Sequence, residues 1–254
     1  MIEKVVIKDN TNSPYGYIAD LPQFENDKEY HFKEGVNIIV GENGCGKSTL
    51  IKLIEAYLMV DLRECSRGAY NSNIARLKRC LKEFTDGIEV YADYKRNTFR
   101  LAHKYEKGPY DILKNVSDFS EFVEQNQSST GESVVVALNS LFSYMFSKDV
   151  KLLFNYENEC GNLIPSYIDY IKEHRIKGDE WTILMDEPDR NLSLKNIENI
   201  KGIFTFHKPQ TQVIAVLHNP LLIYSLHKHC NDINWIEMTD GYIDEVNKTI
   251  EKLV

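Results

Sequence analysis

The fold of this 254-residue chain is decided by the stretch Gly41-Glu42-Asn43-Gly44-Cys45-Gly46-Lys47-Ser48-Thr49. The stretch fits the phosphate-binding loop pattern G-x-x-x-x-G-K-[ST], in which a glycine-rich turn exposes successive backbone N–H groups to phosphate oxygens. Its context also fits, because the apolar run 36–40 predicts a buried strand before the loop and the apolar spacing of 49–62 predicts a helix after it. The positive end of that helix dipole would add to anion binding.

The loop predicts a nucleotide site that binds ATP together with Mg²⁺. Lys47 is expected to reach the β- and γ-phosphates, and Ser48 to be a ligand of Mg²⁺. The other residues expected to contact the nucleotide are Gly41, Asn43, Gly44, Cys45, Gly46 and Thr49. The loop does not specify the base of the nucleotide. The alternative, a glycine-rich turn with a chance lysine, does not account for the flanking strand and helix.

A second motif follows the apolar run 181–185, which ends in Asp186-Glu187-Pro188 and resembles a Walker B strand. An aspartate at the carboxyl end of a buried strand beside the phosphate loop can hold the Mg²⁺ shell, and the adjacent glutamate can polarise the attacking water. Asp186 is therefore predicted to bind the metal and Glu187 to be the general base. Taken alone, the segment could also be an acidic turn after a core strand.

A third motif is the apolar run 212–217, which predicts another buried strand and places His218 at its end. An imidazole near the γ-phosphate can hydrogen-bond the phosphate and orient the glutamate and the water. The predicted catalytic residues are thus Lys47, Glu187 and His218. In isolation a histidine in this position is more often an ordinary loop residue, and it is the order of the three motifs that favours the functional reading.

A fourth motif, Ser128-Ser129-Thr130-Gly131-Glu132-Ser133, precedes the apolar helix predicted over 134–146 and resembles the signature motif of ABC-type ATPases. In that family the motif faces the γ-phosphate bound by a second subunit, so that two protomers enclose two nucleotides. Ser129, Gly131 and Glu132 match best, although the string departs from the transporter form Leu-Ser-Gly-Gly-Gln. The resemblance implies a homodimer that forms on ATP binding. The alternative is an N-capped helix with Ser129 or Thr130 as the cap.

As an ordered set the motifs resemble those of small stand-alone bacterial AAA-family "predicted ATPase" proteins, which are P-loop NTPases. The matching segments are Ile2 to Ile7, Gly41 to Thr49, Ser66-Arg67, Gly131 to Ser133, and His218-Asn219-Pro220. The resemblance implies a single ABC-type ATPase domain over 1–254, with a helical lobe at about 63–147 between the two Walker motifs. The stretch 71–123 carries no matching motif.

Hydrophobic spacing predicts the remaining elements. Strand 2–8 opens the chain, segments 88–94 and 98–105 are expected to form a β-hairpin, and segments 232–237 and 242–246 a second one around Asp240-Gly241. Helices are predicted over 74–84, 111–124, 134–146, 165–174 and 194–206. Strands that alternate with helices in this order predict an α/β fold with a mixed sheet, parallel at its core and antiparallel at its edge.

Composition bounds the location and the partners. No apolar run approaches the ~20 residues that cross a bilayer, and the five scattered cysteines are typical of reduced thiols, so a cytoplasmic protein without membrane insertion is expected. The net charge is -8, but segment 63–107 carries eleven basic and six acidic residues. That segment could contact nucleic acid or an acidic partner, or it could simply be a solvated helical lobe.

The leading hypothesis is a cytosolic ABC-type ATPase in which ATP binding closes a homodimer and hydrolysis reopens it, acting beside an effector such as a defence nuclease or toxin. A membrane-transporter subunit is the first alternative. It is disfavoured because no glutamine occurs between Gln23 and Gln125, where transporters use one to couple magnesium to membrane partners, and because Leu192-Ser193 replaces the usual Leu-Asp. The second alternative is a binding module that holds ATP with negligible hydrolysis.

Overall fold

The computed structural model describes residues 1–8, 20–54, 88–92, 97–101, 181–190, 192, 194–205 and 211–253. Its elements in chain order are β1 (Ile2–Ile7), η2 (Pro22–Phe24), β2 (Glu29–His31), β3 (Gly35–Val40), β4 (Ile88–Ala92), β5 (Asn97–Leu101), β6 (Trp181–Asp186), α9 (Leu194–Thr205), β7 (Thr211–Val216), α10 (Pro220–His229), β8 (Asn234–Glu237) and α11 (Tyr242–Glu251). Residues 47–54 are helical directly after the phosphate loop. The helices predicted over 74–84, 111–124, 134–146 and 165–174 lie outside the described residues. Of the lobe predicted at about 63–147, the structure describes only the strands β4 and β5.

A five-stranded sheet forms the centre of the molecule, with the strand order β5-β6-β7-β3-β8. Every neighbouring pair in it is parallel. The strands predicted before the phosphate loop, before Asp186 and before His218 are β3, β6 and β7, and all three are confirmed. They are also neighbours in the sheet, so their carboxyl ends share one edge.

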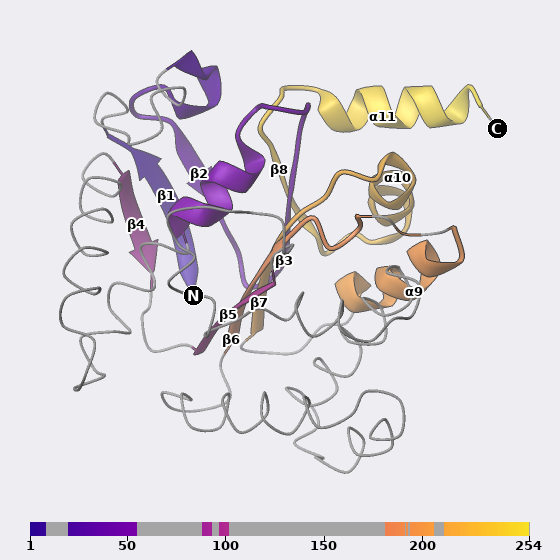
Figure 1. The fold of residues 1–254 in the computed structure, drawn as a ribbon, viewed down its shortest axis with the longest axis horizontal. Helices are drawn as coiled ribbons and strands as arrows, with labels where there is room; N and C mark the ends of the chain where they lie inside the picture. The colour runs from indigo at the N-terminus through magenta and orange to yellow at the C-terminus, as the bar shows by residue number, and fades with distance from the viewer. Residues whose placement is uncertain are drawn as a thin grey trace, which may run out of the picture.

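Both faces of this sheet are buried at its central strands β3, β6 and β7, and this explains the largely apolar sequence of these strands. Along β3, Ile38 packs with the cluster formed by α9, α10 and α11, whereas its neighbour Ile39 packs with the opposite cluster. That second cluster includes Leu50 and Ile54 of the helix after the phosphate loop. In Figure 1 the helices α9 and α10 lie to the right of the parallel strands, and β1, β2 and β4 to their left. No helix within the described ranges has both the length and the apolar character needed to cross a bilayer.

A separate three-stranded antiparallel sheet, with the order β2-β1-β4, covers the second face. A buried glutamine of β7 joins it to the parallel sheet. Gln212 accepts a hydrogen bond from the Ile2 N–H at 2.8 Å and donates to the Ile2 carbonyl at 2.7 Å and to the Lys33 carbonyl at 3.0 Å. The expected parallel core and antiparallel strands are thus present, but the antiparallel strands form their own sheet.

The prediction of a hairpin over 88–105 is wrong. Both of its strands exist, but β4 pairs with β1 and β5 pairs with β6, so they belong to different sheets. Alternation of polar and apolar residues indicates that a segment is extended, and it carries no information about which strand will be its partner. Proximity in sequence suggested the wrong partner.

The prediction of a final hairpin over 232–246 is wrong in its second half. Strand β8 is present, but residues 242–251 form helix α11. Its buried residues Ile243, Val246 and Ile250 recur at helical spacing and pack into the cluster on the helical face. Gly241 adopts φ 74 at the start of this helix, which suits a turn into a helix as well as a hairpin turn.

Replacing Gln212 with Ala should destabilise the fold, because the buried N–H and C=O of Ile2 lose their bonds to this side chain. Leaving buried polar groups unsatisfied costs ~1–3 kcal/mol each, so a loss of about 2–4 kcal/mol is expected in urea unfolding monitored by circular dichroism. Gln212→Glu keeps the size but loses both donated bonds, and it should also destabilise. Full stability in both variants would show that the link between the sheets is not structural.

Candidate functional site

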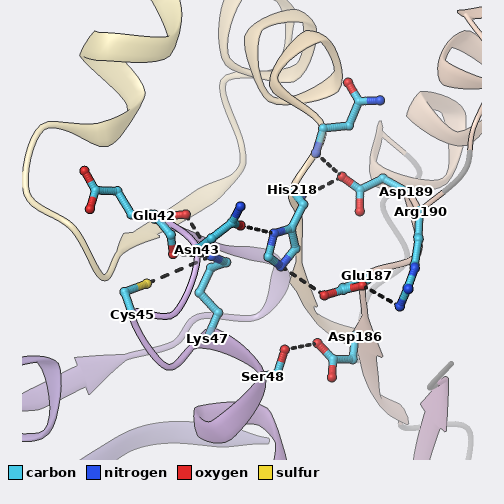
Figure 2. A network of polar contacts seen from close by, with 12 residues as sticks. Glu42, Asn43, Cys45, Lys47, Ser48, Asp186, Glu187, Asp189, Arg190 and His218 are labelled. Atoms are coloured by element: carbon cyan, nitrogen blue, oxygen red, sulfur yellow. Dashed lines mark hydrogen bonds and ion pairs between the residues drawn. The ribbon is translucent and has the colours of Figure 1, made fainter. Parts of the chain in front are cut away.

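The candidate site lies at the carboxyl edge of the parallel sheet. Sheet register sets its geometry, since Asp186 is level with Val216 and Val216 is level with Ile39. The residues that follow these three positions are therefore delivered to the same place. They are the phosphate loop after β3, Glu187 after β6 and His218 after β7 (Figure 2).

The phosphate loop has the backbone that its sequence demands. Gly44 and Gly46 adopt φ 85 and φ 96, a region in which other residues are strained. Lys47 is 3% exposed and curls back over the loop, where its Nζ donates hydrogen bonds of 2.8 Å to the carbonyls of Gly41 and Glu42. Burial lowers the pKa of Lys47, opposed by nearby acidic groups that include Glu187 and Asp186. A phosphate anion beside this ammonium would compensate its burial in the same way.

Ser48 and Asp186 meet across 138 residues of sequence, with the Ser48 hydroxyl donating to Asp186 Oδ1 at 2.9 Å. Hydroxyl and carboxylate oxygens are the ligands that Mg²⁺ prefers, alongside phosphate oxygens and water. The donor set present at this point therefore fits a magnesium ion next to a nucleotide phosphate.

Glu187 occupies a strained backbone position. It is one of two non-glycine residues of the described chain with positive φ, at 52, and its N–H donates to the Val216 carbonyl at 3.2 Å. Strain of this kind costs ~1–3 kcal/mol and clusters at functional sites. The carboxylate is half-buried between two cationic or titratable groups, with Arg190 3.3 Å from Oε2 and His218 Nε2 3.4 Å from Oε1.

His218 connects the phosphate loop to Glu187. Its Nδ1 lies 3.2 Å from Asn43 Oδ1. Its buried Nε2 faces Glu187 at ion-pair distance and has no hydrogen-bond partner within the described part of the chain. Burial lowers the pKa of His218, helped by Lys47 and Arg190 and opposed by Glu187 and Asp189. The lowered pKa favours the uncharged imidazole, whose Nε2 is directed at the site.

The phosphate-loop and Walker B residues and His218 are therefore brought together as the sequence predicts. The sites predicted at Ser129, Gly131 and Glu132 lie outside the described residues, as does the Ser66-Arg67 pair. Thr49 is buried at the start of the helix, and Cys45 is buried with its Sγ 4.0 Å from Lys47 Nζ.

Comparison with known proteins identifies the family. The model of a family described as AAA domain matches residues 18–251, which is most of the chain. The chain belongs to this AAA-domain family. It is a P-loop protein of the ABC-type ATPase class.

Three curated relatives show the breadth of this similarity. The chain is 21% identical to endonuclease GajA of Bacillus cereus over 97% of its own length and 36% of the relative. It is 31% identical to the DNA double-strand break repair Rad50 ATPase of Thermoplasma acidophilum over 46% of its length and 13% of the relative. It is 22% identical to the nickel import system ATP-binding protein NikD of Staphylococcus aureus over 84% of its length and 77% of the relative. The chain spans about a third or less of the first two proteins.

Two residues of this AAA domain's site were not found from the sequence. Thr239, which follows β8, accepts a hydrogen bond from the Glu42 N–H at 3.1 Å and so fixes the start of the phosphate loop. Asp189 lies buried behind Glu187 and accepts hydrogen bonds from the backbone after β7. The 197 residues that separate Thr239 from Glu42 leave no signal in the sequence, whereas Asp189 could have been suspected as a further acid beside the Asp-Glu pair.

Alanine at Gly46 should disturb the phosphate loop more than alanine at Gly44. Both glycines have positive φ, so either substitution carries backbone strain of ~1–2 kcal/mol. A Cβ at Gly46 would also overlap the ring of Phe24, whereas a Cβ at Gly44 meets nothing within 4 Å. Urea unfolding should show an additional loss of ~1–3 kcal/mol for Gly46→Ala. Equal losses would contradict the packing of Phe24 against the loop.

The His218 imidazole should titrate below its ordinary pKa of about 6.5. A histidine whose folded pKa is lowered binds its proton less readily when folded than when unfolded, so acidification below that ordinary value should cost stability. Histidine NMR signals followed against pH measure the midpoint directly. Lys47→Met removes a positive charge that lowers this pKa and should move the midpoint upward. A wild-type midpoint above 6.5 would mean that Glu187 and Asp189 outweigh burial.

Proposed function

We propose that this AAA domain binds Mg-ATP at the carboxyl edge of β3, β6 and β7 and hydrolyses it, using ATP binding to close a homodimer. The observation that carries the proposal is the convergence of Lys47, the Ser48–Asp186 pair and the Glu187–His218 pair on one edge. Each group has the chemistry that one part of phosphoryl transfer to water requires. The family membership supports the same activity class.

The roles follow from position. The N–H groups of the phosphate loop and Lys47 would hold the phosphates, while Ser48 and Asp186 would hold Mg²⁺. The metal, when bound, would neutralise charge on the phosphates. Glu187 would accept a proton from the attacking water, and His218, braced by Asn43, would orient Glu187 and contact the γ-phosphate. Gly41, Gly44, Cys45, Gly46 and Thr49 complete the loop around the nucleotide.

The dimer is proposed from the signature-like residues Ser129, Gly131 and Glu132, which would reach the nucleotide of a second protomer from the start of a helix. A single domain over 1–254 is part of this proposal, with a helical lobe within about 63–147 from which β4 and β5 depart, since they belong to the two sheets. An effector nuclease is a fitting partner, because an endonuclease is among the relatives, and the basic segment 63–107 could contact nucleic acid. A cytoplasmic location is also part of this proposal.

A transporter subunit remains the second candidate, favoured by the similarity to NikD. The missing glutamine between Gln23 and Gln125 favours the dimerisation switch over it. Addition of this chain to a transporter membrane component, with ATP turnover as the readout, would separate the two.

Glu187→Gln tests the proposed mechanism, because it keeps the size of the side chain and removes the base. Loss of a general base costs typically ~10²–10⁴-fold in rate, so hydrolysis should fall by at least about 100-fold while ATP binding persists. Light scattering on a sizing column should then show this variant shifting from monomer to dimer when Mg-ATP is added. Glu198→Gln, an exposed glutamate of α9, is the matched control and should behave as wild type.

Each failure has its own meaning. Unchanged turnover in Glu187→Gln would contradict the assignment of the base and favour a binding module. If Glu187→Gln loses turnover but its mass stays constant when Mg-ATP is added, the dimerisation switch is contradicted. ATP hydrolysis by the wild-type protein would still stand as the proposed function.

A further inference from the structure

The carboxylate of Asp189 is the most deeply buried acidic group next to the site. The residue is 3% exposed and stands in the turn after β6, two positions beyond Glu187. Its Oδ2 accepts hydrogen bonds from the backbone N–H groups of His218, at 2.7 Å, and Asn219, at 2.5 Å. A single oxygen atom of the β6 turn thus holds two consecutive backbone groups that follow β7 (Figure 2).

Burying the carboxylate of Asp189 costs more free energy than its packing alone would return. Burial raises the pKa of Asp189, and the two backbone hydrogen bonds only partly oppose that effect. The other oxygen, Oδ1, is buried without a hydrogen-bond partner among the described residues. A buried carboxylate with an unsatisfied oxygen is expected to stabilise a fold less than an apolar side chain of similar volume. Its benefit is the fixed relation that it creates between two loops.

The two loops carry the groups that must act together. The turn after β6 is held at its start by the hydrogen bond from the Glu187 N–H to the Val216 carbonyl. It is held again at Asp189, whose carboxylate accepts a hydrogen bond from the His218 N–H. Asn219 then accepts hydrogen bonds from the N–H groups of Leu221 and Leu222 and caps α10. The position of the imidazole relative to Glu187 is thereby fixed from the backbone, although the contact between these two side chains is itself loose, at 3.4 Å.

We propose that Asp189 is a positioning residue, whose carboxylate locks the backbone of His218 to the turn of Glu187 and so sets the distance between the imidazole and the general base. The inference rests on the proposed ATPase function. Asp189 touches neither the phosphate loop nor the Ser48–Asp186 pair by any hydrogen bond of the described chain, so it should influence turnover and leave nucleotide affinity unchanged.

The test compares Asp189→Ala with Asp189→Asn. Alanine removes the acceptor, and kcat for ATP should fall roughly 10- to 100-fold with KM little changed, as expected for a displaced catalytic group. Asparagine keeps an acceptor oxygen in the same place and should recover most of kcat. Asn37→Ala is the matched control, since Asn37 is also buried and bonded to backbone groups, but its partners include the carbonyls of Lys33 and Val213, away from the carboxyl ends of the strands. Its kcat per folded molecule should equal that of wild type.

A second readout does not depend on hydrolysis. The amide proton signals of His218 and Asn219 should lie downfield in wild type, as expected for bonds to a carboxylate. They should move upfield in Asp189→Ala, together with displaced imidazole signals, but not in Asn37→Ala.

If wild type hydrolyses no ATP, the proposed function fails and these signals alone decide the positioning role. Wild-type kcat in folded Asp189→Ala, unmoved His218 signals, or a loss in Asp189→Asn as large as in Asp189→Ala would overturn the proposal. If Asp189→Ala does not fold, recovery of both readouts in Asp189→Asn is the deciding result.

Discussion

The hydrogen bond between Ser48 and Asp186 marks the constraint on which the rest of the site depends. It joins residues 138 positions apart, and it can form only because β3 and β6 flank β7 in one parallel sheet. Parallel strands deliver all their carboxyl ends to a single edge, which is where ligands of open α/β sheets bind. The two-sided burial that makes these strands apolar is therefore also what concentrates the polar residues at their ends.

The site combines strained backbone with strong bracing. Glu187 and the glycines of the phosphate loop adopt positive φ, and neighbouring groups hold these positions from behind. Thr239 fixes the start of the loop, the Val216 carbonyl fixes Glu187, and Asp189 fixes the backbone of His218. A site built in this way is organised before its ligand arrives, and such organisation lowers the cost of binding and of orienting reacting groups.

The phosphate loop, the three central strands and the convergence of Lys47, Asp186 and His218 could be predicted from sequence, because each depends on a local pattern and on the rule that parallel strands share an edge. Strand partners could not be predicted. The pattern of 88–101 indicates two strands, whereas their membership of two different sheets depends on packing across the whole molecule. The first part of helix α11 was predicted as a strand because Asp240-Gly241 is typical of a hairpin turn, whereas Ile243, Val246 and Ile250 recur at helical spacing. Asp189 and Thr239 act through distant backbone groups and carry no motif.

The central claim is that Ser48 and Asp186 hold the magnesium of a bound Mg-ATP. Calorimetric titration of ATP, with and without Mg²⁺, into wild type and Asp186→Asn tests it most directly. The account predicts that Mg²⁺ strengthens ATP binding to wild type, and that the variant loses this dependence while it still binds metal-free ATP through the phosphate loop. The same dependence on Mg²⁺ in both proteins would contradict the account.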